Sequence, residues 1–158
     1  MKSFPHYSWK TLVVCLIIVF GVGFSGSLLA NGETSSSWYE SVKPSITPPG
    51  WVFPIVWNIL FALIALSLWV AWTKATPKQR TTLTLWFGAN LVLNALWSLF
   101  YFGMHRPDIA FIDLLLLWIT IVGMIYASGK IDKRAGWLLV PYLVWVSFAG
   151  VLNYLTLS

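Results

Sequence analysis

Charged side chains are scarce in this sequence. Asp, Glu, Lys and Arg make up 9% of its 158 residues, against roughly 25% in an ordinary soluble domain. So few charges exclude a water-soluble globular domain. Lys and Arg exceed Asp and Glu and give a formal net charge of +5, but they form no basic stripe. The sequence therefore argues against a nucleic-acid partner.

Catalytic and metal-binding motifs are also missing. The single cysteine, Cys15, cannot form a disulfide within the chain. The sequence has no Cys-x-x-Cys, no His-Glu-x-x-His, no glycine-rich phosphate loop and no pair of acids inside an apolar segment. His6 and His105 lie near the ends of apolar segments, where they cannot ligate a metal in the middle of a membrane. We therefore expect no conventional enzyme, no metal site and no obligatory cofactor.

Long apolar segments fill most of the chain. Each can supply the ~20 residues that an α-helix needs to cross a bilayer, and such runs suit helices rather than the ~10-residue strands of a membrane barrel. The sequence predicts an all-α membrane protein in which residues 1–158 form one five-helix transmembrane domain. The predicted spans are residues 9–30, 51–73, 81–103, 108–128 and 134–156, with a structured loop, residues 31–50, between the first two. An odd number of spans argues against a transporter built from inverted repeats.

The first apolar segment has an alternative interpretation as a cleaved signal peptide. Lys2 and Lys10 precede it, and Ser27-Leu-Leu-Ala30 loosely resembles a cleavage site. The segment is long for a signal peptide, however, and its small residues between 21 and 27 suit close helix packing. We favour a helix that is retained.

Basic residues divide unevenly between the two sides of the predicted bundle. If the helices alternate in direction, Lys43 and Arg106 lie on one side, and the other holds Lys2, Lys10, Lys74, Lys78, Arg80, Lys130, Lys133 and Arg134. The positive-inside rule then places the N-terminus in the cytoplasm and the C-terminus outside. Short termini without an evident organelle-targeting segment favour a bacterial cell membrane.

The predicted loop is rich in proline and aromatic residues. Pro44, Pro48 and Pro49 fix their own φ angles and bias the preceding residues towards extended conformations, so the loop should be stiff. The aromatic residues Trp38, Tyr39 and Trp51 can anchor it at the lipid headgroups. A stiff, anchored loop, which also carries Lys43, can cover the bundle as a lid, although a plain connector between helices would have the same composition.

Polar and aromatic residues recur at helical spacing in three of the predicted spans. Residues three or four apart share one helix face, and the three faces are Trp57 and Phe61; Asn90, Asn94, Trp97 and Tyr101; and Pro141, Trp145, Ala149 and Asn153. Polar side chains in a bilayer tend to face the bundle interior. The faces therefore predict an aromatic pocket in the outer half of the membrane, beneath the loop, suited to a flat hydrophobic ligand.

A plainer interpretation of the same pattern remains open. The asparagines can simply join neighbouring helices, and the deep tryptophans can simply pack. Asp113, one turn inside the fourth predicted span, is expected to reach the surface or to pair with Arg106.

Several motifs together resemble one family. They are Trp38-Tyr-Glu-Ser-Val-Lys-Pro-Ser-Ile-Thr-Pro-Pro-Gly-Trp-Val-Phe-Pro-Ile-Val-Trp57, Asn90-Leu-Val-Leu-Asn-Ala-Leu-Trp97, Phe102-Gly-Met, and Pro141-Tyr-Leu-Val-Trp-Val-Ser-Phe-Ala-Gly-Val-Leu-Asn153. In this order, across all five predicted spans, they resemble the tryptophan-rich sensory protein family, TspO/MBR. The family is also known as the translocator protein or peripheral benzodiazepine receptor family.

The resemblance implies a five-helix bundle, usually a homodimer, that binds protoporphyrin IX, haem and isoquinoline or benzodiazepine drugs beneath its first loop. It implies that Trp57 and Trp145 are the pocket tryptophans, Asn94 the pocket amide and Ala149 the small residue that shapes the pocket. Vertebrate relatives carry a C-terminal sterol-recognition pattern that ends in a basic residue. Here Val151-Leu-Asn-Tyr154 is followed only by Leu-Thr-Leu-Ser158, so the basic end is absent.

We therefore expect a membrane receptor or sensor that binds a tetrapyrrole, surrounded by membrane lipid. The predicted ligand contacts are Trp57, Phe61, Asn90, Asn94, Trp97, Trp145 and Ala149, with no metal ligand. Two alternatives remain. One is a light-dependent enzyme that degrades protoporphyrin IX, with Trp57 and Trp145 as the photo-oxidised partners. The other is translocation of a porphyrin or a sterol.

Overall fold

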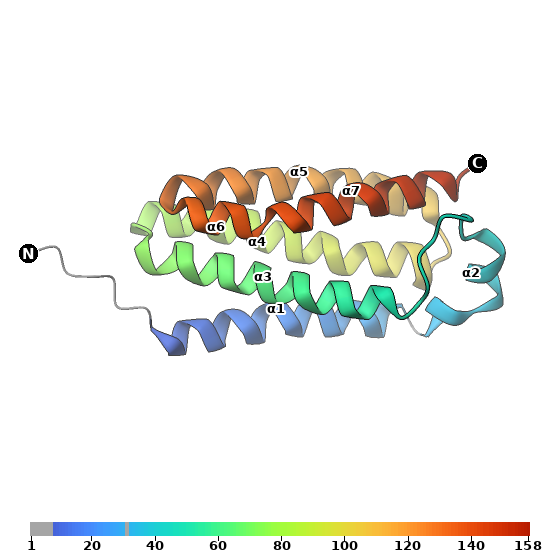
Figure 1. Cartoon of the computed structure of the whole chain (residues 1–158), viewed down its shortest axis with the longest axis horizontal. Helices are drawn as coiled ribbons and strands as arrows, with labels where there is room; N and C mark the ends of the chain where they lie inside the picture. Colours follow the sequence, from blue (N-terminus) through green and yellow to red (C-terminus); the bar gives the residue numbers. More distant parts are fainter. Residues whose placement is uncertain (1–7, 31) are drawn as a thin grey trace, which may run out of the picture.

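In the part of the chain that the structure describes, five helical spans are long and apolar enough to cross a membrane, which confirms the predicted all-α membrane fold (Figure 1). The computed structural model describes residues 8–30 and 32–158. Residues 1–7 and 31, which include Lys2, His6 and the first residue of the predicted loop, lie outside the described residues. The spans are α1 (Trp9–Leu29), α3 (Val52–Lys74), α4 (Pro77–Ser98), α5 (Pro107–Ile131) and a fifth made of α6 (Lys133–Leu138) and α7 (Val140–Leu155). Between α1 and α3 lie the short helices η1 (Glu33–Ser35) and α2 (Ser37–Val42).

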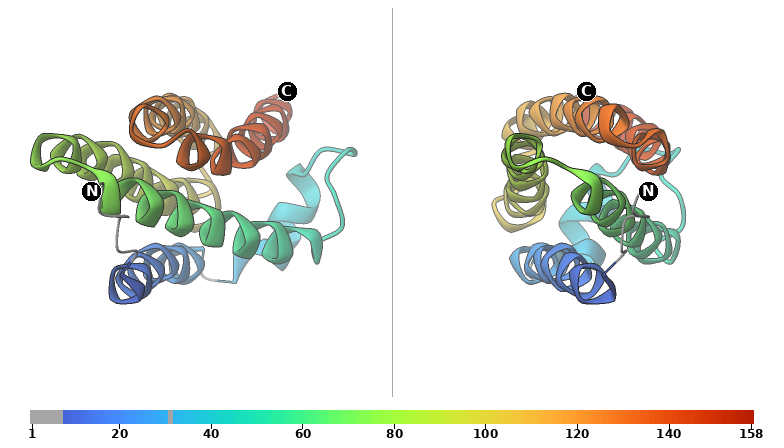
Figure 2. Two further views of the ribbon diagram at one scale, coloured as in Figure 1. Left: turned by 60° about the vertical axis from the view of Figure 1, so that its left-hand side comes forward. Right: turned by 90° about the vertical axis from the view of Figure 1, so that its left-hand side faces the viewer.

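Seen along their axes, the helices form a ring (Figure 2). Helix α1 packs on α3 and α4, α4 packs on α5, and α5 packs on α6 and α7. Helix α3 closes the ring mainly through α6 and touches α7 much less. A hydrogen bond from Ser67 Oγ of α3 to the carbonyl oxygen of Ala135 in α6, 2.8 Å long, fixes the first of these contacts.

The fifth span is broken, which the sequence analysis did not predict. Pro141 lies in the first turn of α7, where it cannot donate a backbone hydrogen bond to α6 and disfavours helical geometry in the residue before it. Because of the break, α6 stays against α3 while α7 turns away from it. Helices α3 and α7 therefore diverge towards the end that carries α2 (Figure 2).

The start of α4 differs from the prediction, and its far end, although it stops at the predicted residue 103, has an unpredicted geometry. The helix begins at Pro77 rather than at residue 81, because Thr76 and Gln79 form a capping box in front of the apolar run. At its other end the last turn widens into a π-helix, η2 (Leu99–Gly103), in which the Met104 N–H donates to the Leu99 carbonyl at 2.8 Å. Such turns often mark functional regions. Here η2 turns Tyr101 and Phe102 towards the loop.

Glycines on a helix surface can form a contact between two copies of the chain, but two of them here pack closely against side chains of the same chain. A Cβ atom on Gly23 would lie 2.4 Å from the Phe61 ring, and one on Gly123 would lie 2.4 Å from the Trp86 ring. Gly21 and Gly88, in contrast, have open space where a Cβ would stand.

Gly103 gives a test of this packing. A Cβ on Gly103 would lie 2.7 Å from the Leu29 carbonyl oxygen, a backbone atom that cannot rotate away. We expect Gly103→Ala to lower the free energy of unfolding by about 1–3 kcal/mol, measured by thermal unfolding in detergent. Gly21→Ala is the matched control and should be neutral or slightly stabilising. Equal stability of the two variants would contradict the close contact between η2 and α1.

Candidate functional site

A cavity of about 790 Å³ lies between the helices at the end that carries α2. It occupies the region where α3 and α7 diverge, and side chains from every long helix contribute to its wall. Six of the seven predicted ligand contacts line it, namely Trp57, Phe61, Asn94, Trp97, Trp145 and Ala149. The helix faces that residue spacing predicted therefore line one cavity.

Aromatic rings from α3 and α7 line the cavity and contact one another. Trp57 packs on Phe61, with ring centroids 5.5 Å apart, and meets Tyr142 edge to face at 6.2 Å. Trp145 meets Phe53 edge to face at 5.8 Å. These contacts fix the orientation of both indoles without filling the space between their helices.

Two polar atoms in the wall are buried without a hydrogen-bond partner among the described residues. They are the indole nitrogen Nε1 of Trp145 and the hydroxyl oxygen Oγ1 of Thr47, a loop residue that the sequence analysis missed. A buried indole N–H normally has an acceptor. An acceptor on a ligand within the cavity would satisfy it.

The predicted contact Asn90 does not line the cavity. Its side chain is fully buried one turn below Asn94 and has both a donor and an acceptor partner. Tyr142 Oη donates to Asn90 Oδ1 at 3.1 Å, and Asn90 Nδ2 donates to Thr120 Oγ1 at 2.9 Å. Asn94 Nδ2 donates to the same Tyr142 oxygen at 3.2 Å, so Asn94 joins the cavity to this network.

The prediction for Asp113 is corrected by the structure. Asp113 neither reaches the surface nor pairs with Arg106, because it is buried within the bundle and only 5% exposed. Arg106 instead binds Asp108, with Nη2 and Oδ2 2.6 Å apart. Trp118 lies outside the cavity and donates to Ser147 Oγ at 2.9 Å.

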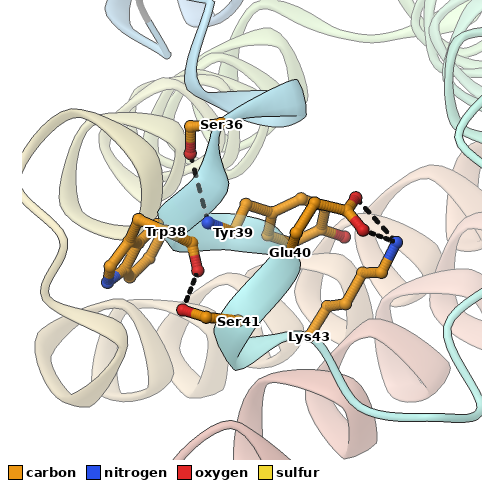
Figure 3. A network of polar contacts seen from close by, with 6 residues as sticks. All are labelled: Ser36, Trp38, Tyr39, Glu40, Ser41 and Lys43. Carbon is orange, nitrogen blue, oxygen red and sulfur yellow. Dashed lines mark hydrogen bonds and ion pairs between the residues drawn. The ribbon is translucent and has the colours of Figure 1, made fainter.

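The loop after α1 covers one end of the cavity. Tyr39, Lys43, Pro44 and Pro48 line it, whereas Trp38, Pro49 and Trp51 do not. The structure adds a short helix, α2, that proline content did not predict. The Ser36 hydroxyl accepts from the Tyr39 N–H, Ser41 Oγ donates to the Trp38 carbonyl, and Lys43 binds Glu40 at 2.6 Å (Figure 3).

Aromatic contacts attach α2 to the turn between α4 and α5. Trp38 stacks on His105, with ring centroids 4.1 Å apart, and Tyr39 meets Phe102 edge to face at 5.3 Å. Trp38 and Tyr39 therefore pack on the bundle, whereas Trp51 remains 67% exposed. Burial, together with nearby Tyr101 and Glu40, raises the pKa of Tyr39 to about 12. Its phenol keeps its proton and can donate to a ligand.

The sequence of this chain is similar to those of several known proteins. Residues 13–157 match the model of the TspO/MBR family. The tryptophan-rich protein TspO of Chlorobaculum tepidum is 42% identical over 154 residues, covering 94% of each chain. The tryptophan-rich sensory protein of Cereibacter sphaeroides is 31% identical over 94% of this chain and 90% of its own. The translocator protein of Ovis aries is 30% identical over 92% of this chain and 88% of its own.

Tyr142 gives a test of the network below the cavity. Tyr142→Phe removes the oxygen that joins Asn94 to Asn90. We expect the free energy of unfolding to fall by about 1–2 kcal/mol, because interhelical hydrogen bonds in membrane proteins contribute ~0.6 kcal/mol each on average and two buried amides lose a partner. Thermal unfolding in detergent measures the change. Tyr154→Phe, at a ring that is 60% exposed, is the control, and an equal effect of both variants would count against the network.

Proposed function

The chain belongs to the TspO/MBR family of membrane proteins, and we propose that it is a receptor that binds tetrapyrroles, such as protoporphyrin IX or haem, within the aromatic cavity. Isoquinoline and benzodiazepine compounds are further ligands of the same chemical kind, being flat and apolar with few hydrogen-bond acceptors. The volume of about 790 Å³ lies within the range of ~300–1,000 Å³ typical of small-molecule sites.

The unpaired indole N–H of Trp145 is the observation that carries this proposal. The indoles of Trp97 and Trp118 donate to Asn153 and Ser147, so their polar atoms are already used by the fold. Trp145 Nε1 is buried in the cavity wall and has no such partner within the described part of the chain. A conjugated ring that packs against Trp57 and Trp145, and brings an acceptor to the edge of the Trp145 indole, would use both the apolar surface and the unpaired donor.

Binding by stacking needs no metal ligand from the protein. Among the described residues that line the cavity there is no histidine, cysteine or methionine. Offset aromatic pairs contribute ~0.5–1.5 kcal/mol each beyond surface burial, and a large apolar ring adds the burial itself. We therefore propose that the free-base and iron-containing rings bind through the same contacts, with their acidic groups towards the loop and Lys43.

The charge distribution supports an orientation in the membrane. Lys10, Lys74, Lys78, Arg80, Lys130, Lys133 and Arg134 all belong to the end of the bundle opposite α2. By the positive-inside rule, we propose that this end faces the cytoplasm of a bacterial cell and that the cavity lies in the outer half of the cell membrane. We further propose a homodimer, for which the open helix surface at Gly88 is a candidate contact.

A titration of protoporphyrin IX tests the proposal. It is followed in the dark by the absorbance of the ligand, so that photochemical loss of pigment does not contribute. Trp145→Phe keeps an aromatic ring but removes the N–H, and we expect the Kd to rise about five- to tenfold, as for the loss of one hydrogen bond worth ~1 kcal/mol. Trp57→Phe combined with Trp145→Phe should weaken binding further.

The matched control is Trp118→Phe, because Trp118 is an indole at membrane depth that does not line the cavity. Its Kd should equal that of the unmodified protein. An unchanged Kd in Trp145→Phe, or an equal rise in Trp118→Phe, would show that the ligand binds elsewhere.

A further inference from the structure

A second, smaller hollow lies at the opposite end of the molecule from the aromatic cavity. It is a groove of about 240 Å³ at the junction of α5 and α6, lined by Ile125, Gly129, Lys133, Gly136, Trp137 and Val140. It shares no lining residue with the cavity. We infer that this groove, which we name the basic-end groove, binds one molecule of an anionic phospholipid of the phosphatidylglycerol class.

Two glycines create the groove. A Cβ on Gly136 would lie 3.1 Å from the Gly129 Cα atom and 3.1 Å from the Ile125 carbonyl oxygen. The end of α5 and the short helix α6 therefore approach each other backbone to backbone. Because neither glycine has a side chain, the surface beside this contact stays hollow, with Trp137 and Lys133 at its edges.

The groove carries an uncompensated positive charge. Within residues 8–30 and 32–158, the Lys133 ammonium group makes no ion pair. The neighbouring acid, Asp132, binds Lys74 and accepts a hydrogen bond from the Arg134 backbone N–H. The hydrogen bond from Lys74 holds the pKa of the Asp132 carboxyl below its usual range, so its negative charge is already engaged. An anion is therefore the complementary partner for Lys133.

The apolar part of the groove decides which kind of anion fits. Lys133 lies at the end of the span, while Ile125 and Val140 lie further along their helices into the membrane. Trp137 is 72% exposed and stands at the level where indoles meet lipid headgroups. A phosphate beside Lys133 with an acyl chain over Ile125 and Val140 uses the whole groove, whereas a small water-soluble anion would use only its charged end. A zwitterionic lipid brings its own cation and gains less from Lys133.

Native mass spectrometry of the full chain tests the inference. The protein is released from detergent after incubation with equal amounts of phosphatidylglycerol and phosphatidylcholine, and the fraction that retains each lipid is measured. We expect preferential retention of one phosphatidylglycerol molecule. Lys133→Gln should lower that retention about fivefold, the effect of removing one basic residue from an anionic lipid surface. Lys78→Gln, at an exposed lysine of the same end that does not line the groove, should not.

A second pair of variants tests the shape of the groove independently of charge. Trp137→Ala removes one wall and should also lower phosphatidylglycerol retention, whereas Trp9→Ala removes an indole that is 68% exposed near the same end and should leave it unchanged. Thermal unfolding of each variant confirms that the fold is intact. Equal retention of the two lipids, full retention by Lys133→Gln, or equal losses in Lys78→Gln or Trp9→Ala would each overturn the inference. None of these outcomes bears on tetrapyrrole binding.

Discussion

A short chain of hydrogen bonds through the apolar interior holds one side of the bundle together. Asn94 donates to Tyr142, Tyr142 to Asn90, and Asn90 to Thr120. The chain crosses from α4 to α7, back to α4 and on to α5. No water is present at this depth to replace a lost partner, so separating these helices would leave several polar groups unsatisfied. Helices α4, α5 and α7 are therefore fixed as one unit, and the rest of the fold is arranged around it.

The cavity follows from how α3 joins that unit. Helix α3 is attached through α1 on one side and through α6 on the other, where Ser67 binds the Ala135 carbonyl. Pro141 separates α6 from α7, so both halves of the fifth span pack on α5, but only the first half packs closely on α3. The space between α3 and α7 is then lined by side chains but not filled by them.

Four tryptophans differ in the partner of the indole N–H. Trp69, Trp97 and Trp118 donate to Ser8, Asn153 and Ser147, and so they act as cross-links between segments of the chain. Trp145 is packed on Phe53 and held in place, yet its N–H is left without a partner in the described residues. The same residue type thus cross-links the chain at these three positions, whereas Trp145 keeps an N–H available for recognition.

The sequence by itself determined the number of spans, their helical nature, and the faces that carry Trp57, Asn94 and Trp145, because apolar length and 3.6-residue periodicity are local properties of the chain. It did not determine that the Asn90 side chain is hydrogen-bonded within the bundle while Asn94 lines the cavity, or that Asp113 is buried. Periodicity gives the rotation of each helix about its own axis but not the distance between helices. Only the tertiary structure, through the break at Pro141 and the hydrogen bonds of Tyr142, decided where the helices touch and where they leave a space.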